Sequence, residues 1–302
     1  MRVGLIAVDG KYPNLALMKL SAWHKAQGHH VSLYTPVEAA IEPFDKVYAS
    51  KIFTFTPDYA YMPEGAILGG TGYGDPVQLQ DEVEHITPDY SLYGIDYSLG
   101  FTSRGCSRKC SFCVVPAKEG SIREHSPLSE FVRHRTVVLQ DNNFLAAHLA
   151  EDKLLEMIEK KLDVDFNQGL DIRLMTARFA DLLARLKPKK LRFAWDDVSL
   201  EGKFRKGIEL LKNAGYRVNR HNVMTYVLCN YNTEFKEDMH RVQVLRSLDI
   251  APFAMIYNKA GAPRVMREFA NWCNLPQQFN KHSFNSYLIS RNQPPLSSFW
   301  EV

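Results

Sequence analysis

The sequence contains no run of about 18 apolar residues, the length that a helix needs to cross a membrane. It contains no Walker loop, no His-Glu-x-x-His motif and no Ser-His-Asp order, so these phosphate-binding, metalloprotease and hydrolase signatures are excluded. The formal net charge of +3 is too small to indicate nucleic-acid binding by itself. We therefore expect a protein without membrane spans whose function depends on another kind of site.

Cysteine is scarce, and its placement is uneven. Only five cysteines occur in 302 residues, and three of them fall within one short stretch, which is not a disulfide framework. A reducing cytoplasm fits this usage better than a secreted setting. Hydrophobic residues make up 45% and charged residues 24%, a balance that argues against disorder and allows the core of one large or two modest domains.

The clustered cysteines are Cys106, Cys110 and Cys113, spaced Cys-x3-Cys-x2-Cys, with Phe112 just before the last. Three soft thiolates can converge on an iron–sulfur cluster or on zinc. A cubane cluster has four irons, so three cysteines leave one iron open to a small molecule. Zinc usually takes four ligands in tightly spaced pairs, which favours iron–sulfur here.

Residues outside the cysteine motif also bear on the choice between an iron–sulfur cluster and zinc. A fourth zinc ligand would have to come from residues that lack a tightly spaced partner, namely His125, His134, Cys229 or Cys273. Next to the cysteines we expect Arg104, Arg108 and Lys109 to lower the thiol pKa values and to offset the charge of a ligated cluster.

The cysteine motif resembles that of the radical S-adenosylmethionine (SAM) superfamily, strongly from about Leu99 to Tyr257. The lead-in Thr102-Ser103-Arg104-Gly105-Cys106 is similar to the branch that often carries a cobalamin-binding domain before the motif. The resemblance implies a 4Fe-4S cluster whose open iron is chelated by SAM, with an electron from a flavodoxin or ferredoxin. Cleavage of SAM would give methionine and a 5′-deoxyadenosyl radical that abstracts hydrogen from a substrate. The resemblance does not identify that substrate.

Strand and helix patterns alternate along the whole chain, which predicts an α/β fold. Residues 1–75 predict a small Rossmann-like parallel domain, 76–96 a linker or lid, 97–263 a partial (β/α)6 TIM-like barrel and 264–302 a C-terminal extension. The six barrel strands are expected at Ser98–Thr102, Val137–Gln140, Val164–Asn167, Leu191–Asp196, Val223–Cys229 and Pro252–Tyr257. In a parallel barrel the chemistry lies at the carboxyl ends of the strands.

The first domain resembles a cobalamin-binding domain, including Gly69-Gly70 after an apolar strand. The family's lower-ligand motif is Asp-x-His-x-x-Gly, and here Asp9-Gly10-Lys11 has Lys11 where the histidine would stand. Cobalamin is therefore possible but not favoured, and we interpret the domain as a relic that packs against the catalytic one.

Polar residues follow the second and third barrel strands. By the resemblance, Asp141, Asn142 and Asn143 meet the amino group of SAM; alone, the segment would be an ordinary turn and helix cap. After the third strand, Gln168, Asp171 and Arg173 are expected to contact the ribose hydroxyls and the carboxylate of SAM. An Asp–Arg structural pair is an equal alternative there.

The fourth and fifth strands end on three further candidates for cofactor binding. Trp195 would stack on adenine or substrate, or pack in the core, and Asp196 would bind a hydroxyl or cap a helix. Cys229 lies near the expected adenine position, although a buried small apolar side chain is the better interpretation. No catalytic acid, base or radical-quenching residue can be identified.

Two rival functions are consistent with the sequence. One is a zinc-binding module in which the loop Arg104–Lys109 contacts nucleic-acid phosphates. The other is a radical SAM enzyme that modifies RNA instead of a small molecule, although no RNA-binding appendage is recognisable.

Overall fold

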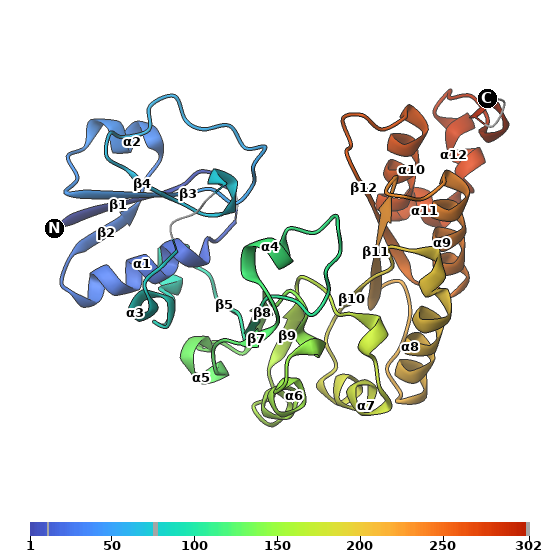
Figure 1. Ribbon diagram of the computed structural model, residues 1–302, viewed down its shortest axis with the longest axis horizontal. Coiled ribbons are helices and arrows are strands. Elements are labelled where there is room, and N and C mark those ends of the chain that lie inside the picture. The colour runs from blue at the N-terminus through green and yellow to red at the C-terminus, as the bar shows by residue number, and fades with distance from the viewer. Residues whose placement is uncertain (11, 75–77, 300–302) are drawn as a thin grey trace. The chain divides into compact units, whose positions relative to one another are not determined.

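The computed structural model describes residues 1–10, 12–74 and 78–299, which form a mixed α/β fold with parallel sheets (Figure 1). The chain divides into two compact units, Met1–Thr102 with His125–Val138, and Ser103–Glu124 with Leu139–Val302. The α/β class expected from the sequence is thereby confirmed. Lys11, residues 75–77 where the expected first domain meets the expected linker, and residues 300–302 of the expected extension lie outside the described residues.

The first unit holds a four-stranded parallel sheet in the order β2-β1-β3-β4. Its sheet strands are β1 (Arg2–Ala7), β2 (His30–Leu33), β3 (Lys46–Ser50) and β4 (Ile67–Gly69), and its main helices are α1 (Leu15–Ala26), α2 (Pro36–Ile41) and α3 (Asp81–Glu84). The small parallel sheet that the sequence predicts for residues 1–75 is thus present.

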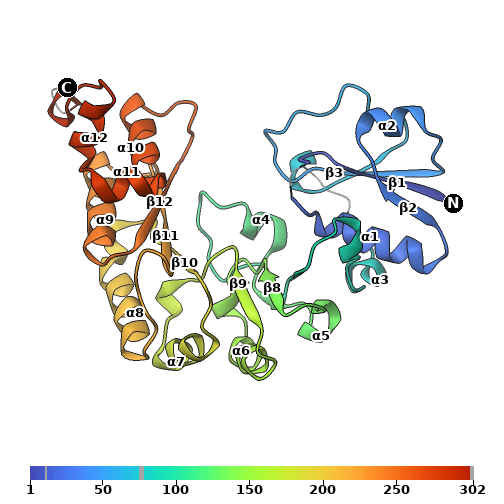
Figure 2. The ribbon, with the colours of Figure 1, turned by 180° about the vertical axis from the view of Figure 1, so that it is seen from behind.

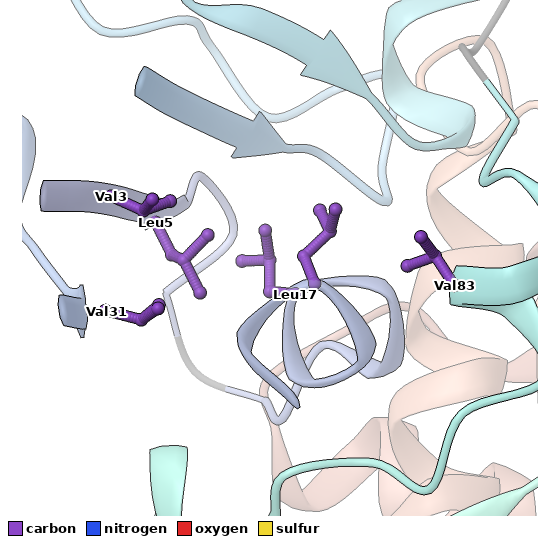
Figure 3. Packing of buried hydrophobic residues seen from close by; sticks show 6 residues of the cluster. Val3, Leu5, Leu17, Val31 and Val83 are labelled. Carbon is purple, nitrogen blue, oxygen red and sulfur yellow. The ribbon is translucent and has the colours of Figure 1, made fainter. Parts of the chain in front are cut away.

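Helix α1 positions the core of this unit. Asn14 begins the helix, because its side-chain oxygen accepts a hydrogen bond from the backbone N–H of Leu17 at 3.2 Å. Figure 3 shows Leu17 of α1 beside Leu5 of β1, with Val83 of α3 on the other side of the helix. Burying these aliphatic side chains is the main favourable free energy of such a layer.

The first unit differs from the expected domain boundaries, because it also contains residues 78–102 and 125–138. These two segments carry β5 (Ser98–Gly100), α5 (Leu128–Phe131) and most of β8 (Thr136–Leu139). The hydroxyl of Tyr90 donates to the carbonyl of Phe131 at 2.5 Å, and the Ser98 hydroxyl accepts from the His134 N–H at 3.0 Å. Long-range bonds of this kind leave no signal in local sequence patterns.

A buried histidine in α1 should make the stability of this unit depend on pH. His24 is 1% exposed, and its Nε2 lies 3.0 Å from the hydroxyl of Tyr48. Burial, together with the nearby His29, lowers the pKa of His24 to about 4. An unfolded histidine has a pKa of about 6.5, so between pH 6.5 and 4 the unfolded state binds more protons. The free energy of unfolding should therefore fall as the pH drops through this window.

We expect His24→Gln to lose less stability than the wild type between pH 7 and pH 5, because glutamine does not titrate. Urea unfolding at the two pH values measures this loss, and His30→Gln, at an exposed position, is the matched control. Equal losses in the wild type and in His24→Gln would show that another group causes the pH dependence.

The second unit alternates strands and helices. Its strands are β6 (Ser103–Arg104), β7 (Arg123–Glu124), β9 (Asp163–Phe166), β10 (Leu191–Ala194), β11 (Val223–Cys229) and β12 (Ala251–Ile256). Its helices are α4 (Val115–Glu119), α6 (Ala150–Glu159), α7 (Ala177–Leu186), α8 (Glu201–Asn213), α9 (Phe235–Ser247), α10 (Arg264–Asn274), α11 (Pro276–Lys281) and α12 (Phe284–Ser290).

Strands β10, β11 and β12 form a parallel sheet in that order. A single parallel bridge from Leu170 to Phe193 places the segment after β9 beside β10. All six strand candidates correspond to strands, and β11 has the predicted bounds. The complete six-stranded barrel stays a prediction.

The expected extension is helical. Phe269 and Trp272 of α10 pack on Phe284 of α12 at centroid distances of 5.5 and 5.4 Å, and on each other at 5.9 Å. The Asn274 side chain accepts from the N–H of Ala254 at 2.8 Å and donates to its carbonyl at 3.0 Å, which caps the free edge of β12. Within the described chain, no helix combines the length and the apolar character needed to span a membrane.

Candidate metal and cofactor site

The three clustered cysteines lie on a loop closed by a short hairpin. Strands β6 and β7 pair antiparallel on either side of the loop, and α4 follows the last cysteine. The N–H of Cys106 donates to the carbonyl of Gly120 at 3.2 Å, and the N–H of Cys113 donates to the carbonyl of Cys110 at 3.0 Å. All three side chains are partly exposed, so they are open to a ligand.

Glu119, the last residue of α4, fixes the start of this loop. One of its carboxylate oxygens accepts from the N–H of Gly105 at 3.0 Å and from the Asn142 amide at 2.8 Å, and it forms an ion pair with Arg104 at 3.1 Å. Gly105 has a φ of +78°, and a Cβ there would come within 2.3 Å of the Ser121 carbonyl oxygen, so no other residue fits. The sequence analysis missed Glu119, since no local pattern marks this contact.

Arg108, between the first two cysteines, ties the loop to the segment after β9. Asp171 accepts from the Arg108 Nε at 3.0 Å, and from the Arg173 Nε and terminal nitrogen at 2.6 and 2.9 Å. Burial alone would raise the pKa of Asp171, but the two guanidinium groups outweigh it and lower the pKa. The Asp–Arg pair considered in the sequence analysis is therefore present, and it also holds the cysteine loop. Gln168, three residues before Asp171 in the chain, is exposed.

The segment after β8 touches the cysteines directly. The Asn143 amide donates to the sulfur of Cys106 at 3.4 Å, while its own oxygen is buried and accepts no hydrogen bond from the part of the chain that the structure describes. Asp141 accepts from the N–H and the hydroxyl of Ser103, both at 2.6 Å, and so anchors β6. Buried polar atoms are normally paired, so the oxygen of Asn143 points to a missing donor.

The electrostatics of the thiols differ from the expectation. Burial raises the pKa of Cys110; Arg173 opposes this rise, whereas Asp196 and the neighbouring thiols add to it. Our prediction that the nearby cations lower the thiol pKa values is wrong for Cys110. The reason is that Arg108 is already paired with Asp171, just as Arg104 is paired with Glu119.

Cys106, Cys110 and Cys113 do not form a group of metal ligands in this structure. Among residues 1–10, 12–74 and 78–299, no three His, Cys, Asp or Glu side chains are grouped as metal ligands.

Aromatic residues extend the site to the ends of β11 and β12. The hydroxyls of Ser111 and Tyr231 lie 2.6 Å apart, and the Tyr231 ring contacts those of Phe112 at 5.2 Å and Tyr257 at 4.6 Å. Asn230 and Asn232, on either side of Tyr231, have φ values of +61° and +50°, as their tolerance of left-handed turns predicts. This turn directs Tyr231 to the cysteine loop.

The remaining candidates lie deeper. Trp195 is fully buried, stacks on Phe204 at 4.7 Å and donates from its indole N–H to the Asp197 carbonyl at 2.7 Å. Cys229 is also fully buried, which raises its pKa strongly. Both side chains are core residues here and offer no surface to a cofactor. Asp196 is only partly buried; burial raises its pKa against the opposing charges of Arg241 and Arg173.

A buried ion pair missed by the sequence analysis supports these strand ends. Arg241 of α9 is 0% exposed and donates to the carbonyls of Trp195 at 2.6 Å and Leu228 at 2.8 Å. It also pairs with Asp238 at 2.5 Å, which in turn accepts from the Asn230 N–H at 3.1 Å. The pair therefore joins the ends of β10 and β11 to the turn that carries Tyr231.

The first unit contains a separate cavity of about 240 Å³ between α1, β3 and β4. Leu20 and Tyr48 line it, together with Gly69 and Gly70. Gly70 has a φ of +93°, and a Cβ there would come within 2.3 Å of a carbonyl oxygen. The cavity lies at the glycine pair that carries the resemblance to cobalamin-binding domains, and cobalamin binding stays a prediction.

Comparison with known proteins adds no relative. A scan against protein-family models finds no match to this chain, and a search of curated proteins finds none. Chemically, the site combines three thiols, a buried unpaired amide oxygen and a paired Asp–Arg network, all within the second unit.

Proposed function

We propose that this chain is a radical SAM enzyme in which Cys106, Cys110 and Cys113 hold a 4Fe-4S cluster. The observation that carries the proposal is Asn143, whose amide donates to the sulfur of Cys106 while its buried oxygen has no donor among the described residues. An acceptor held next to a cluster ligand suits the ammonium group of SAM. The chain thus supplies both the sulfur ligands and an acceptor for the small molecule.

The donor set fits the cluster chemically. Three thiols on one loop are soft ligands, the kind that iron–sulfur clusters use. Backbone and side-chain N–H groups already point at sulfur: the Arg108 N–H donates to Cys106 at 3.3 Å, in addition to the Asn143 amide. Such donors stabilise a ligated thiolate and tune its electronics.

The other residues of the site hold the cysteine loop in place and orient a bound ligand. Arg108 and Arg173 share the single carboxylate of Asp171, so one positive charge is left in excess beside the cysteine loop. Arg173 favours the thiolate of Cys110, and the excess charge would attract a carboxylate. Tyr231 and Phe112 pack edge to face on the β11 side of the loop. When bound, the cluster would supply the electron that cleaves SAM to methionine and a 5′-deoxyadenosyl radical.

The partners follow from this chemistry. A flavodoxin or ferredoxin is the proposed electron donor, and the substrate, a small molecule or an RNA, is the partner still to be identified. All five cysteines are free thiols, which suits the reducing cytoplasm that we propose.

Anaerobic reconstitution tests the function. The wild-type protein should bind about four irons per chain and, with dithionite and SAM, release 5′-deoxyadenosine. Asn143→Ala should keep its iron but raise the KM for SAM about tenfold or more, because a hydrogen bond to a charged group is lost. Asn213→Ala, at an exposed position of α8, should match the wild type in both measurements.

Two outcomes would count against this function. One is a tightly held zinc ion with no iron uptake, which would favour the zinc-binding module. The other is iron uptake without any 5′-deoxyadenosine in the presence of SAM and reductant. An unchanged KM for Asn143→Ala would remove this residue from the SAM site.

A further inference from the structure

The sheet β10–β11–β12 has one face that its helices leave uncovered. Along β12, Phe253, Met255 and the following Tyr257 are 39%, 38% and 44% exposed, whereas the alternate residue Ala254 is 3% exposed. Side chains alternate between the two faces of a strand, so these three share one face. In register with them on β11, Tyr226 pairs with Phe253. We call Tyr226, Phe253, Met255 and Tyr257 the open face.

The opposite face belongs to the core. Phe193, Thr225 and Val227 are fully buried there, and Phe204 of α8 and Val242 of α9 are among the buried helix residues. Figures 1 and 2 show α8 and α9 running along one side of β10–β12. A strand that exposes three large apolar side chains in alternation therefore has a face without a partner in the described chain, and large exposed apolar patches mark binding sites.

The open face carries aromatic rings, and the arginine that lies in register with it on β10 is already paired. Tyr226 and Phe253 meet edge to face at 5.8 Å. Arg192 of β10 lies on the same face and donates to Asp165 of β9, with one of its hydrogen bonds at 3.2 Å. An anionic ligand would find its positive charge already neutralised, whereas a flat neutral ring could stack on the aromatic side chains.

The open face is continuous with the candidate site. Tyr257, at the end of β12, contacts Tyr231 at 4.6 Å, and Tyr231 contacts Phe112 of the cysteine loop at 5.2 Å. A ligand lying on Phe253 and Met255 would thus have one end directed to the cysteine loop. This continuity favours the substrate of the site as occupant over a partner that binds elsewhere.

We propose that the open face binds the substrate of this enzyme through an uncharged aromatic or flat apolar group. The inference rests on the proposed function, because the occupant is taken to be the molecule that reacts at the neighbouring site. It narrows the substrate class: polyanions such as RNA are disfavoured by the paired Arg192, and neutral aromatic compounds are favoured.

A matched pair of probes tests this selectivity. Fluorine NMR titrations of the full-length reconstituted protein would compare 4-fluorophenol, which is neutral near pH 7, with 4-fluorobenzoate, which is an anion of similar size. We expect 4-fluorophenol to bind at least about tenfold more tightly, since the open face offers ring contacts and the guanidinium of Arg192 is already paired. Phe253→Thr and Met255→Thr should each weaken its binding at least about fivefold. Ile289→Thr, at a residue of α12 that is 57% exposed, should leave binding unchanged.

Several results would overturn the inference. Three of them are equal affinity for the two probes, full affinity in the β12 variants, and displacement of 4-fluorophenol by a short RNA. The fourth is a protein dimer that dissociates on Phe253→Thr, because that result would assign the open face to a second copy of the chain. Threonine suits a strand, and circular dichroism checks the fold of each variant. Iron content and 5′-deoxyadenosine are measured on the same samples. If the protein bound 4-fluorophenol selectively but took up no iron, the result would contradict the proposed function. It would still support the selectivity of the open face.

Discussion

Cys110→Ala is expected to reduce bound iron from about four per chain to almost none and to abolish 5′-deoxyadenosine formation. Cys110 is the middle residue of the motif, and it lies among Arg173, Asp196 and the other two thiols, whose charges all act on its pKa. Removing one of only three protein ligands leaves two irons of a cubane without a protein ligand. Iron analysis and product chromatography after anaerobic reconstitution measure the two losses.

The matched control for this prediction is Cys229→Ala. Cys229 is fully buried, its thiol donates to the Val227 carbonyl at 3.3 Å, and it lies outside the motif. We expect this variant to keep its iron and its product, with only the modest loss of stability that follows from a small cavity. If both variants bound iron equally, the cysteine loop would not be the cluster site.

Arg241→Met is expected to lower the free energy of unfolding by about 3–5 kcal/mol, because it leaves the carboxylate of Asp238 buried without its counter-charge. Both side chains of the pair are 0% exposed, and Arg241 also satisfies the carbonyls of Trp195 and Leu228. Those carbonyls are at the ends of β10 and β11, so the substitution should also destabilise the candidate site. Urea unfolding followed by circular dichroism measures the change.

An exposed arginine provides the comparison. Arg205 pairs with Glu201 one turn away on α8 and is 45% exposed, so Arg205→Met should cost less than about 1 kcal/mol. The double variant Asp238→Leu with Arg241→Met should be more stable than Arg241→Met alone, since it removes the uncompensated charge. A loss below about 1 kcal/mol for Arg241→Met would mean that the pair is not what supports these strand ends.

Local patterns were sufficient to predict most of the regular structure. Strand β11 alternates buried and half-buried residues from Val223 to Val227, and its bounds follow from that periodicity. The start of α1 follows from Asn14, whose capping bond is local. Helix α2 was missed although Thr35-Pro36 and Glu38 form a capping box with proline at the first turn, a signal that is present in the sequence.

The candidate site could be predicted only where the residues that form it are close together in the sequence. The cysteine spacing and the polar residues after β8 and β9 could be read directly, and the Asp171–Arg173 contact spans only two positions. The contact of Glu119 with Asn142, and that of Ser111 with Tyr231, join residues far apart in the chain. Propensity carries no information about such contacts, because they arise only after the strands have paired.

The pKa of Cys110 was mispredicted for a related reason. Arg104 and Arg108 are adjacent to the cysteines in sequence, but each is paired with a carboxylate that the sequence does not place nearby. Burial then dominates the pKa of the thiol. Trp195 shows the same effect for packing: its position at a strand end suggested a ligand contact, and α8 supplies Phe204 to cover it instead.

The most direct test of the central proposal is electron paramagnetic resonance of the anaerobically reconstituted, dithionite-reduced protein, recorded with and without SAM. The account predicts the signal of a reduced 4Fe-4S cluster that changes when SAM is added and that is absent from Cys110→Ala. A protein that shows no cluster signal, or whose signal is identical with and without SAM, would contradict it.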